Sequence, residues 1–208
     1  GKITVTDRQH LLDFLTIAKR ANNYKFIMLD VIFEQGIDSE LDSALFATIT
    51  SMDRIVIPVH EDAPLNDSSL YAKAANADYT ITWKETSFSR YQFLHDTIPS
   101  MPLVIYQQMT GDGIHQNGLF YFSHGRLCYN GVTLKLPVKI SGQYIDKDNV
   151  RERTYLYLGS DLLALDSIMP IADQIKDKIV VCGDFNNDVH ITYAGMQPGS
   201  VICLDAFY

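Results

Sequence analysis

The chain has 208 residues, of which 47% are hydrophobic and 20% are charged, and its formal net charge is −8. This length and composition are typical of a globular protein, and we expect a single domain over residues 1–208 with its own hydrophobic core. Because no run of Lys or Arg is available to neutralise phosphates, the acidic balance argues against a nucleic-acid partner. No apolar stretch of the sequence is long enough to span a bilayer.

Helix and strand patterns alternate over the first 60 residues, after a short strand expected over residues 3–5. A Thr-x-x-Gln capping pattern at Thr6 predicts a helix with one apolar face that ends near Asn22. The apolar run 25–33 predicts a buried strand, and an amphipathic helix over 41–52 leads to a second buried strand over 54–59. Helices between buried strands predict βαβ units with a parallel sheet.

The middle of the sequence is less regular. Strand patterns are predicted over 79–83, 103–106, 132–140 and 154–158, with polar loops between them. Two further β-rich runs flank a two-residue turn at His124, which predicts a hairpin. We expect this region to be an irregular, β-containing insertion.

The C-terminal part returns to a regular pattern. Pro170 fits the first turn of a short helix, and the β-branched run 178–182 then predicts a strand buried on both faces of a parallel sheet. A short strand over 189–193 and a helix over 201–208 are expected to follow. Together these elements predict an α/β fold: a central, largely parallel or mixed sheet, flanked by helices, with an irregular middle region.

Acidic residues and one histidine lie at or after the ends of the two most apolar predicted strands, over 25–33 and 178–182. If these strands are parallel neighbours, their carboxyl ends meet at one edge of the sheet, where α/β proteins place ligands. The ligand-binding candidates are therefore Asp30, Glu34, Asp184, Asp188 and His190. These side chains could instead cap turns, with Asp30 a buried carboxylate that binds backbone N–H groups.

An ordered set of short motifs carries a family resemblance. The first half has an Asp-ended strand at Asp30, then Glu40-Leu41-Asp42-Ser43-Ala44-Leu45, then Ile55-Val56-Ile57-Pro58. The second half has Lys176-Asp177-Lys178-Ile179-Val180-Val181-Cys182-Gly183, then Asp188-Val189-His190-Ile191-Thr192, then Pro198-Gly199. The order resembles that of the CHASE2 family of bacterial extracytoplasmic sensor domains, and it covers little of residues 60–153. The chain departs from the family at Ile202-Cys203-Leu204-Asp205, where the family shows Ile-His-Ala-Asn.

The resemblance implies a sensory domain on the extracytoplasmic side of the bacterial cytoplasmic membrane. Such a domain would respond to a small-molecule or protein stimulus, without a cofactor and without catalysis of its own. The resemblance also implies membrane spans on both sides of the domain. Phe207 and Tyr208 suit a membrane–water interface, so we expect the helix over 201–208 to lead into one span.

An enzymatic alternative uses the same acidic residues. Carboxylate oxygens suit a hard divalent cation, and a histidine adds a nitrogen ligand. In this interpretation Asp30, Asp184, Asp188 and His190 hold a metal whose bound water is the nucleophile of a hydrolase.

Overall fold

The computed structural model describes residues 7–33, 39–78, 87–134, 163–164, 166–185, 187–193 and 195–207. The strands predicted at the N-terminus, over 79–83 and over 154–158 lie outside these residues. Residues 135–140 of the strand predicted over 132–140 and the candidate residue Glu34 also lie outside them. The predictions for these segments remain predictions.

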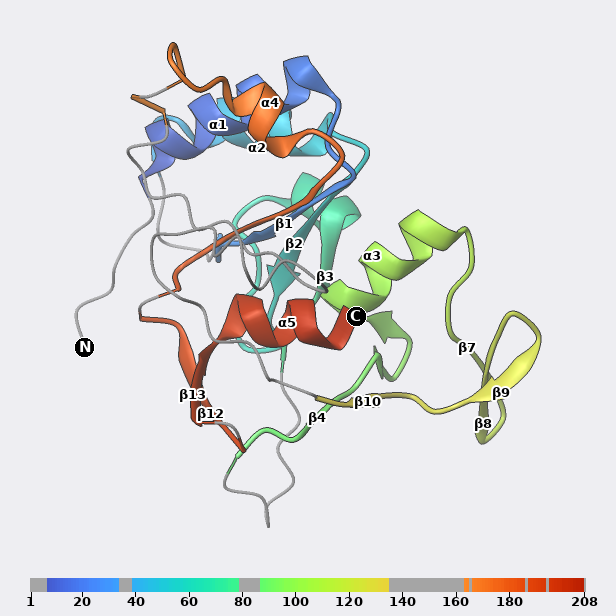
Figure 1. The fold of residues 1–208 in the computed structure, drawn as a ribbon. Coiled ribbons are helices and arrows are strands. Elements are labelled where there is room, and N and C mark those ends of the chain that lie inside the picture. Colours follow the sequence, from blue (N-terminus) through green and yellow to red (C-terminus); the bar gives the residue numbers. More distant parts are fainter. Residues whose placement is uncertain are drawn as a thin grey trace, which may run out of the picture.

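The described helices and strands alternate up to β3, and beyond it groups of short strands follow one another between the helices (Figure 1). The helices are α1 (Arg8–Ala21), α2 (Asp42–Thr50), the 3-10 helix η1 (Ser68–Lys73), α3 (Met101–Thr110), α4 (Ile171–Ile175) and α5 (Gly199–Phe207). The strands of the main sheet are β1 (Phe26–Asp30), β2 (Ile55–Val59), β3 (Ala74–Asn76) and β11 (Ile179–Gly183). The smaller strands are β4 (Arg90–Tyr91), β5 (Leu94–His95), β6 (Ile98–Pro99), β7 (His115–Asn117), β8 (Phe120–Ser123), β9 (Arg126–Cys128), β10 (Val132–Thr133), β12 (Val189–Thr192) and β13 (Gly195–Pro198).

The main sheet has four parallel strands in the order β11-β1-β2-β3. The smaller strands form antiparallel pairs β4–β10, β5–β6 and β12–β13 and a three-stranded sheet β7-β8-β9. The α/β fold with a mainly parallel sheet and an irregular middle is therefore confirmed. The two strands expected to be neighbours, β1 and β11, pair directly, with Asp30 opposite Gly183.

Helices cover both faces of the main sheet (Figure 1). Alternate residues of β1 point to opposite sides: Ile27 and Leu29 belong to the core beneath α1, α2 and α4. Phe26 and Met28 belong to the core beneath α3 and α5. Strand β1 is buried on both faces, whereas β11 is an edge strand whose residues are only half-buried. The prediction that the run 178–182 is fully buried is therefore wrong.

Helix α1 begins one residue later than its capping pattern predicts. The Asp7 carboxylate accepts hydrogen bonds from the backbone N–H groups of Gln9 and His10, at 2.9 and 3.0 Å. Asp7 is therefore the N-cap, because an acidic side chain bonds the exposed N–H groups of a first turn as well as Thr does. The other end is as predicted, with Asn22 in the left-handed conformation at φ 46°.

The strand predicted over 103–106 is wrong, because these residues lie in α3. Four apolar residues are too few to distinguish a strand from one turn of a buried helix. Two neighbours favour the helix: Ser100 is extended before the first turn, and a proline stands inside that turn. The buried pair Met101 and Ile105 then has helical spacing and packs on the sheet.

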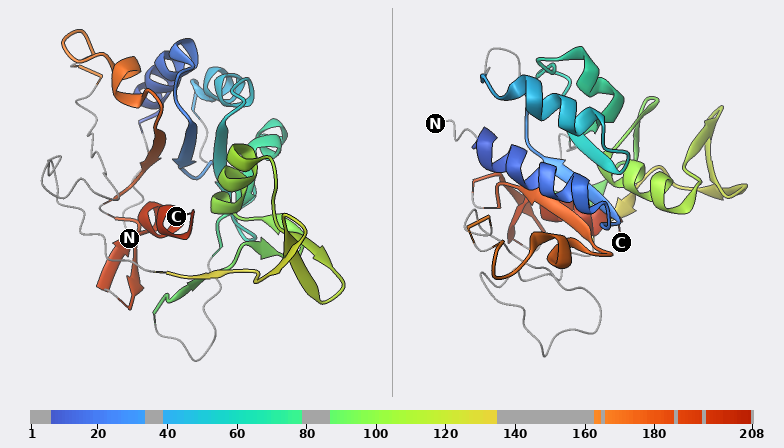
Figure 2. Two further views of the ribbon diagram at one scale, coloured as in Figure 1. Left: turned by 45° about the vertical axis from the view of Figure 1, so that its right-hand side comes forward. Right: turned by 90° about the horizontal axis from the view of Figure 1, so that it is seen from above.

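The predicted hairpin at His124 is confirmed and gains a third strand. His124 and Gly125 have φ values of 50° and 71°, as a two-residue hairpin turn with both residues left-handed requires. Together β7, β8 and β9 form an arm that extends away from the main sheet (Figure 2). We call it the β7–β9 arm. Its large apolar side chains include Leu119 and Leu127, which are 90% and 66% exposed.

The central position of β1 predicts a large cost for truncating its side chains. Leu29→Ala should lower the free energy of unfolding by about 2–5 kcal/mol, because Leu29 is fully buried and its loss leaves a cavity. Leu119→Ala in the exposed β7–β9 arm is the matched control and should change that energy by no more than about 0.5 kcal/mol. Urea unfolding measures both variants. Equal costs would show that β1 is not the centre of the core.

Candidate functional site at the carboxyl edge of the sheet

Asp30 ends the central strand, and its carboxylate binds the last helix. The Ser200 hydroxyl donates a hydrogen bond to Asp30 Oδ2 at 2.6 Å. Since α5 begins at Gly199, Ser200 lies in the first turn of this helix, where the positive end of the helix dipole favours a carboxylate. One side chain of the sheet edge is therefore joined directly to α5.

Gly183 makes this close approach possible. It ends β11 opposite Asp30, and a Cβ placed on it would overlap Ser200 Oγ and lie 3.2 Å from Asp30 Cβ. The backbone of Gly183 is not in a left-handed conformation, so the glycine is needed for space and not for its φ angle. Ser200 thus occupies the volume that any other side chain at position 183 would fill.

The environment of Asp30 opposes its ionisation. Although the residue keeps some exposed surface, its carboxyl lies deep among protein atoms, and this desolvation raises its pKa above the usual 3.8. The Ser200 hydrogen bond lowers the pKa, the negative charge of Asp188 raises it, and His60 and His190 lower it. Asp188, His60 and His190 therefore lie near enough to Asp30 to influence its ionisation.

Asp188, just before β12, and His190, on β12, form a second pair at this edge. His190 Nε2 lies 3.0 Å from Asp188 Oδ1, and the His190 ring meets the Phe88 ring edge to face, with centroids 5.5 Å apart. The Gly199 N–H donates to the Asp188 carbonyl oxygen at 2.9 Å. This pair therefore adjoins the start of α5, as Asp30 does.

Asp184 follows β11 but mainly stabilises a turn. Its two carboxylate oxygens accept hydrogen bonds from the Asn187 N–H and Asn187 Nδ2, at 2.9 and 2.7 Å. Asp184 therefore caps a turn, as expected from the sequence if the acidic residues do not bind a ligand. The structure thus brings Asp30, Asp188 and His190 to one edge and gives Asp184 a structural partner.

Two further residues at this edge were missed by the sequence predictions. His60 follows β2 and Asp78 follows β3, and His60 Nδ1 lies 2.9 Å from Asp78 Oδ1. The Glu61 N–H also donates to Asp78 Oδ2, at 3.0 Å. Both residues come just after a strand, close to the position that Asp30 has at the end of β1, and this is the signal that could have identified them. The strand β3 that positions Asp78 has only three residues and no clear pattern of its own.

A buried tyrosine lies on the α5 side of the same edge. Tyr91 OH is 3.5 Å from Cys203 Sγ. Burial raises the pKa of Tyr91 well above its usual range, and the nearby charges of Asp30 and Asp78 raise it further. Tyr91 is therefore a neutral group packed between α5 and the polar residues of the edge.

The candidate residues do not form a metal centre in the described part of the chain. Within residues 7–207, leaving out the gaps given above, no three His, Cys, Asp or Glu side chains are grouped closely enough to hold a metal ion. None of the described helices is long and apolar enough to span a lipid bilayer. In comparisons with known proteins, no family model, curated protein or solved structure matches the chain.

The contact between positions 183 and 200 predicts a coupled effect on stability. Gly183→Ala should lower the free energy of unfolding by about 1–3 kcal/mol, because the added methyl group overlaps Ser200 Oγ. Ser200→Ala removes that oxygen, so the double variant should lose less than the sum of the two single losses, by at least about 0.5 kcal/mol. Urea unfolding of the four proteins measures this difference. Strictly additive losses would show that the two positions do not meet.

The raised pKa of Asp30 predicts a pH dependence with a defined sign. Above the usual pKa of 3.8 the unfolded chain has lost the Asp30 proton while the folded chain still holds it, so raising the pH lowers stability. The loss ends once Asp30 also ionises in the folded protein. Asp30→Asn cannot titrate, so the stability of the wild type minus that of the variant should fall as the pH rises from about 4. Urea unfolding across a pH series measures this difference; a flat or rising difference would contradict the assignment.

Proposed function

We propose that the chain is the ligand-binding sensory domain of a bacterial membrane signalling protein, on the extracytoplasmic side and without catalytic activity of its own. The observation that carries the proposal is the hydrogen bond between Asp30 at the sheet edge and Ser200 in the first turn of α5. A small-molecule or protein stimulus that binds at this edge would alter the position of α5.

The packing of α5 favours its movement as one body. Residues 199–206 are buried, and the helix packs against α3, β11 and β13. Close-packed interfaces shift between discrete arrangements and do not deform continuously. A stimulus needs only a different affinity for the two positions of the helix to shift the equilibrium between them.

The family resemblance supports the same function. Its two halves lie at opposite ends of the sequence, yet their strands β1 and β11 pair side by side, and both contribute to the carboxyl edge. The resemblance fails at Cys203, which stands where the family shows His, and Cys203 contacts Tyr91. The stimulus of this chain therefore need not be that of any family member.

Reporter insertion in the full-length parent protein tests the proposed location. Gly118 lies in an exposed turn of the β7–β9 arm with open space around it, so an insertion there should leave the core intact. Alkaline phosphatase, whose disulfides require an oxidising compartment, should be active at this position. Green fluorescent protein at the same position is the matched control and should stay dark after export by the general secretion route. A fluorescent control with an inactive phosphatase would place the domain in the cytoplasm and contradict the proposal.

A further inference from the structure

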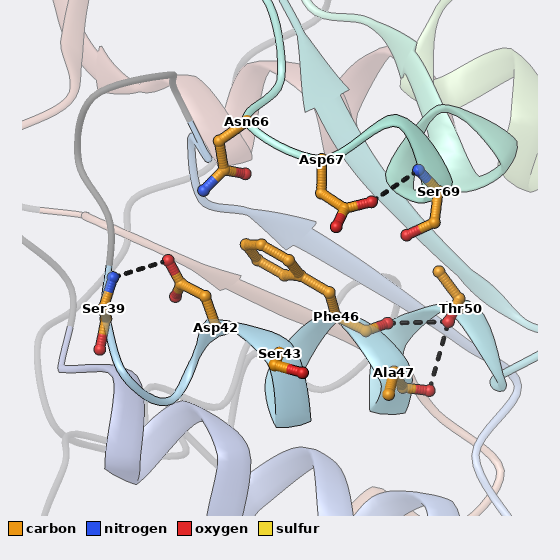
Figure 3. A pocket seen from close by; sticks show the side chains of 9 residues that line it. All are labelled: Ser39, Asp42, Ser43, Phe46, Ala47, Thr50, Asn66, Asp67 and Ser69. Atoms are coloured by element: carbon orange, nitrogen blue, oxygen red, sulfur yellow. Dashed lines mark hydrogen bonds between the residues drawn. The ribbon is translucent and has the colours of Figure 1, made fainter.

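A polar hollow of about 560 Å³ lies between α2 and the segment that leads into η1 (Figure 3). Its volume is within the range of small-molecule sites. The main lining residues are Asp42, Ser43, Phe46, Thr50, Asn66 and Asp67. Helix α2 follows β1 and the η1 segment follows β2, so one end of the hollow lies near the carboxyl edge of the sheet, on the face opposite α5. From there the lining follows α2 to its last residue, Thr50.

The chemistry of the lining excludes several ligand classes. The described lining residues offer hydroxyl, carboxylate and carboxamide groups, and none of them is Lys, Arg or His. An anionic ligand would be repelled by the Asp67 carboxylate and would find no cationic side chain among these described lining residues. A purely apolar ligand would leave the polar lining without partners, at a cost in free energy. The hollow therefore suits a ligand that offers several hydrogen-bond donors.

The charge of Asp42 is already balanced. Asp42 Oδ1 lies 3.3 Å from Arg8 Nε, and both side chains are at most 10% exposed. The Arg8 guanidinium is also stacked over the Phe33 ring, 4.7 Å from its centroid. Asp42 Oδ2 accepts a hydrogen bond from the Ser39 N–H at 2.9 Å. Asp42 is thus a fixed acceptor that does not need a cationic ligand.

Asp67 is held by hydrogen bonds at the start of η1, and within the described residues it has no Arg partner of the kind that Asp42 has. Its Oδ1 accepts a hydrogen bond from the Ser69 N–H at 2.7 Å (Figure 3). Hydrogen bonds from the Ser69 hydroxyl and N–H lower the pKa of Asp67, so it remains an ionised acceptor at neutral pH. Its second oxygen can accept a further hydrogen bond from a ligand.

Asn66 adds an acceptor that the protein does not satisfy. Its carboxamide lies beside Asp67 above the hollow, and its Oδ1 is buried without a hydrogen-bond partner (Figure 3). A buried acceptor of this kind destabilises the folded protein until a donor reaches it. In Figure 3 the amide nitrogen of Asn66 points toward the hollow and Oδ1 points to the side, so a ligand hydroxyl would reach Oδ1 once the amide rotates to exchange the two atoms.

We propose that this hollow binds a neutral, polyhydroxylated small molecule of about the size of a monosaccharide. Arg8 balances the charge of Asp42, and Ser69 holds Asp67 by hydrogen bonds, so both carboxylates are fixed acceptors for hydroxyl donors. The Ser43 hydroxyl, on an exposed residue of α2, can both donate and accept. Only the further step, that this ligand is the stimulus of a sensor, rests on the proposed function.

Nuclear magnetic resonance titration of the purified protein tests the site. D-glucose, D-galactose and myo-inositol are the probes, each added up to about 100 mM, which would detect a Kd in the millimolar range. At least one probe should cause saturable shifts in the amide signals of α2 and of residues 66–69. The amide signals of the β7–β9 arm should not move.

Two variants locate the binding. Asn66→Ala should weaken the binding about tenfold or more, because it removes the unsatisfied acceptor. Ser43→Leu should weaken it to a similar degree by filling the hollow, and Ser43 is exposed, so this variant is expected to fold even if Asn66→Ala does not. Asn117→Ala is the matched asparagine control on the exposed strand β7 and should bind as the wild type does.

Three outcomes would overturn the proposal. The first is that none of the three probes shifts the amides of the hollow. The second is that tetramethylammonium ions shift them and the polyols do not, which would make the hollow a cation site. The third is polyol binding that both pocket variants leave unchanged. A cytoplasmic location of the domain would remove the sensory function but would leave polyol binding intact, so the two proposals fail separately.

Discussion

The hydrogen bond from Ser200 to Asp30 joins the last helix to the central strand, and the surrounding structure is arranged to permit it. Gly183 leaves the space that the Ser200 hydroxyl occupies. Burial raises the free-energy cost of ionising Asp30, and the hydrogen bond from the Ser200 hydroxyl offsets part of the cost of burying this carboxyl. The Asp30 carboxyl of β1, Gly183 of β11 and the Ser200 hydroxyl of α5 therefore lie next to one another.

The parallel sheet explains why two polar sites occur at one edge. In such a sheet the helices run opposite to the strands, so their first turns gather at the carboxyl ends of the strands. Arg8, Asp42 and Ser200 all lie in first turns of helices, and each takes part in a polar contact there. The Asp30 contact uses the α5 face and the polar hollow uses the α2 face. The gathering of helix first turns at the carboxyl ends of the strands thus accounts for both the Asp30 contact and the polar hollow.

Local patterns in the sequence were sufficient for most of the regular elements. The β-branched and apolar runs identified β1, β2 and β11, and these strands fixed the edge at which Asp30, Asp188 and His190 lie. The same reasoning failed for α3, because four apolar residues fit a strand and a buried helix equally well. It could not find the partner of Asp30, since no local pattern relates that carboxyl to a hydroxyl 170 positions later.

That separation also governs the order in which the sheet can be completed during synthesis. The ribosome delivers β1 and β2 early, whereas β11 and α5 emerge only after the whole irregular middle region. Until then one side of β1 is an open strand edge with unpaired N–H and C=O groups, which can pair with other chains. The nascent protein is therefore most exposed to aggregation while its middle region is being translated, and a chaperone that shields the open edge of β1 would protect it during that interval.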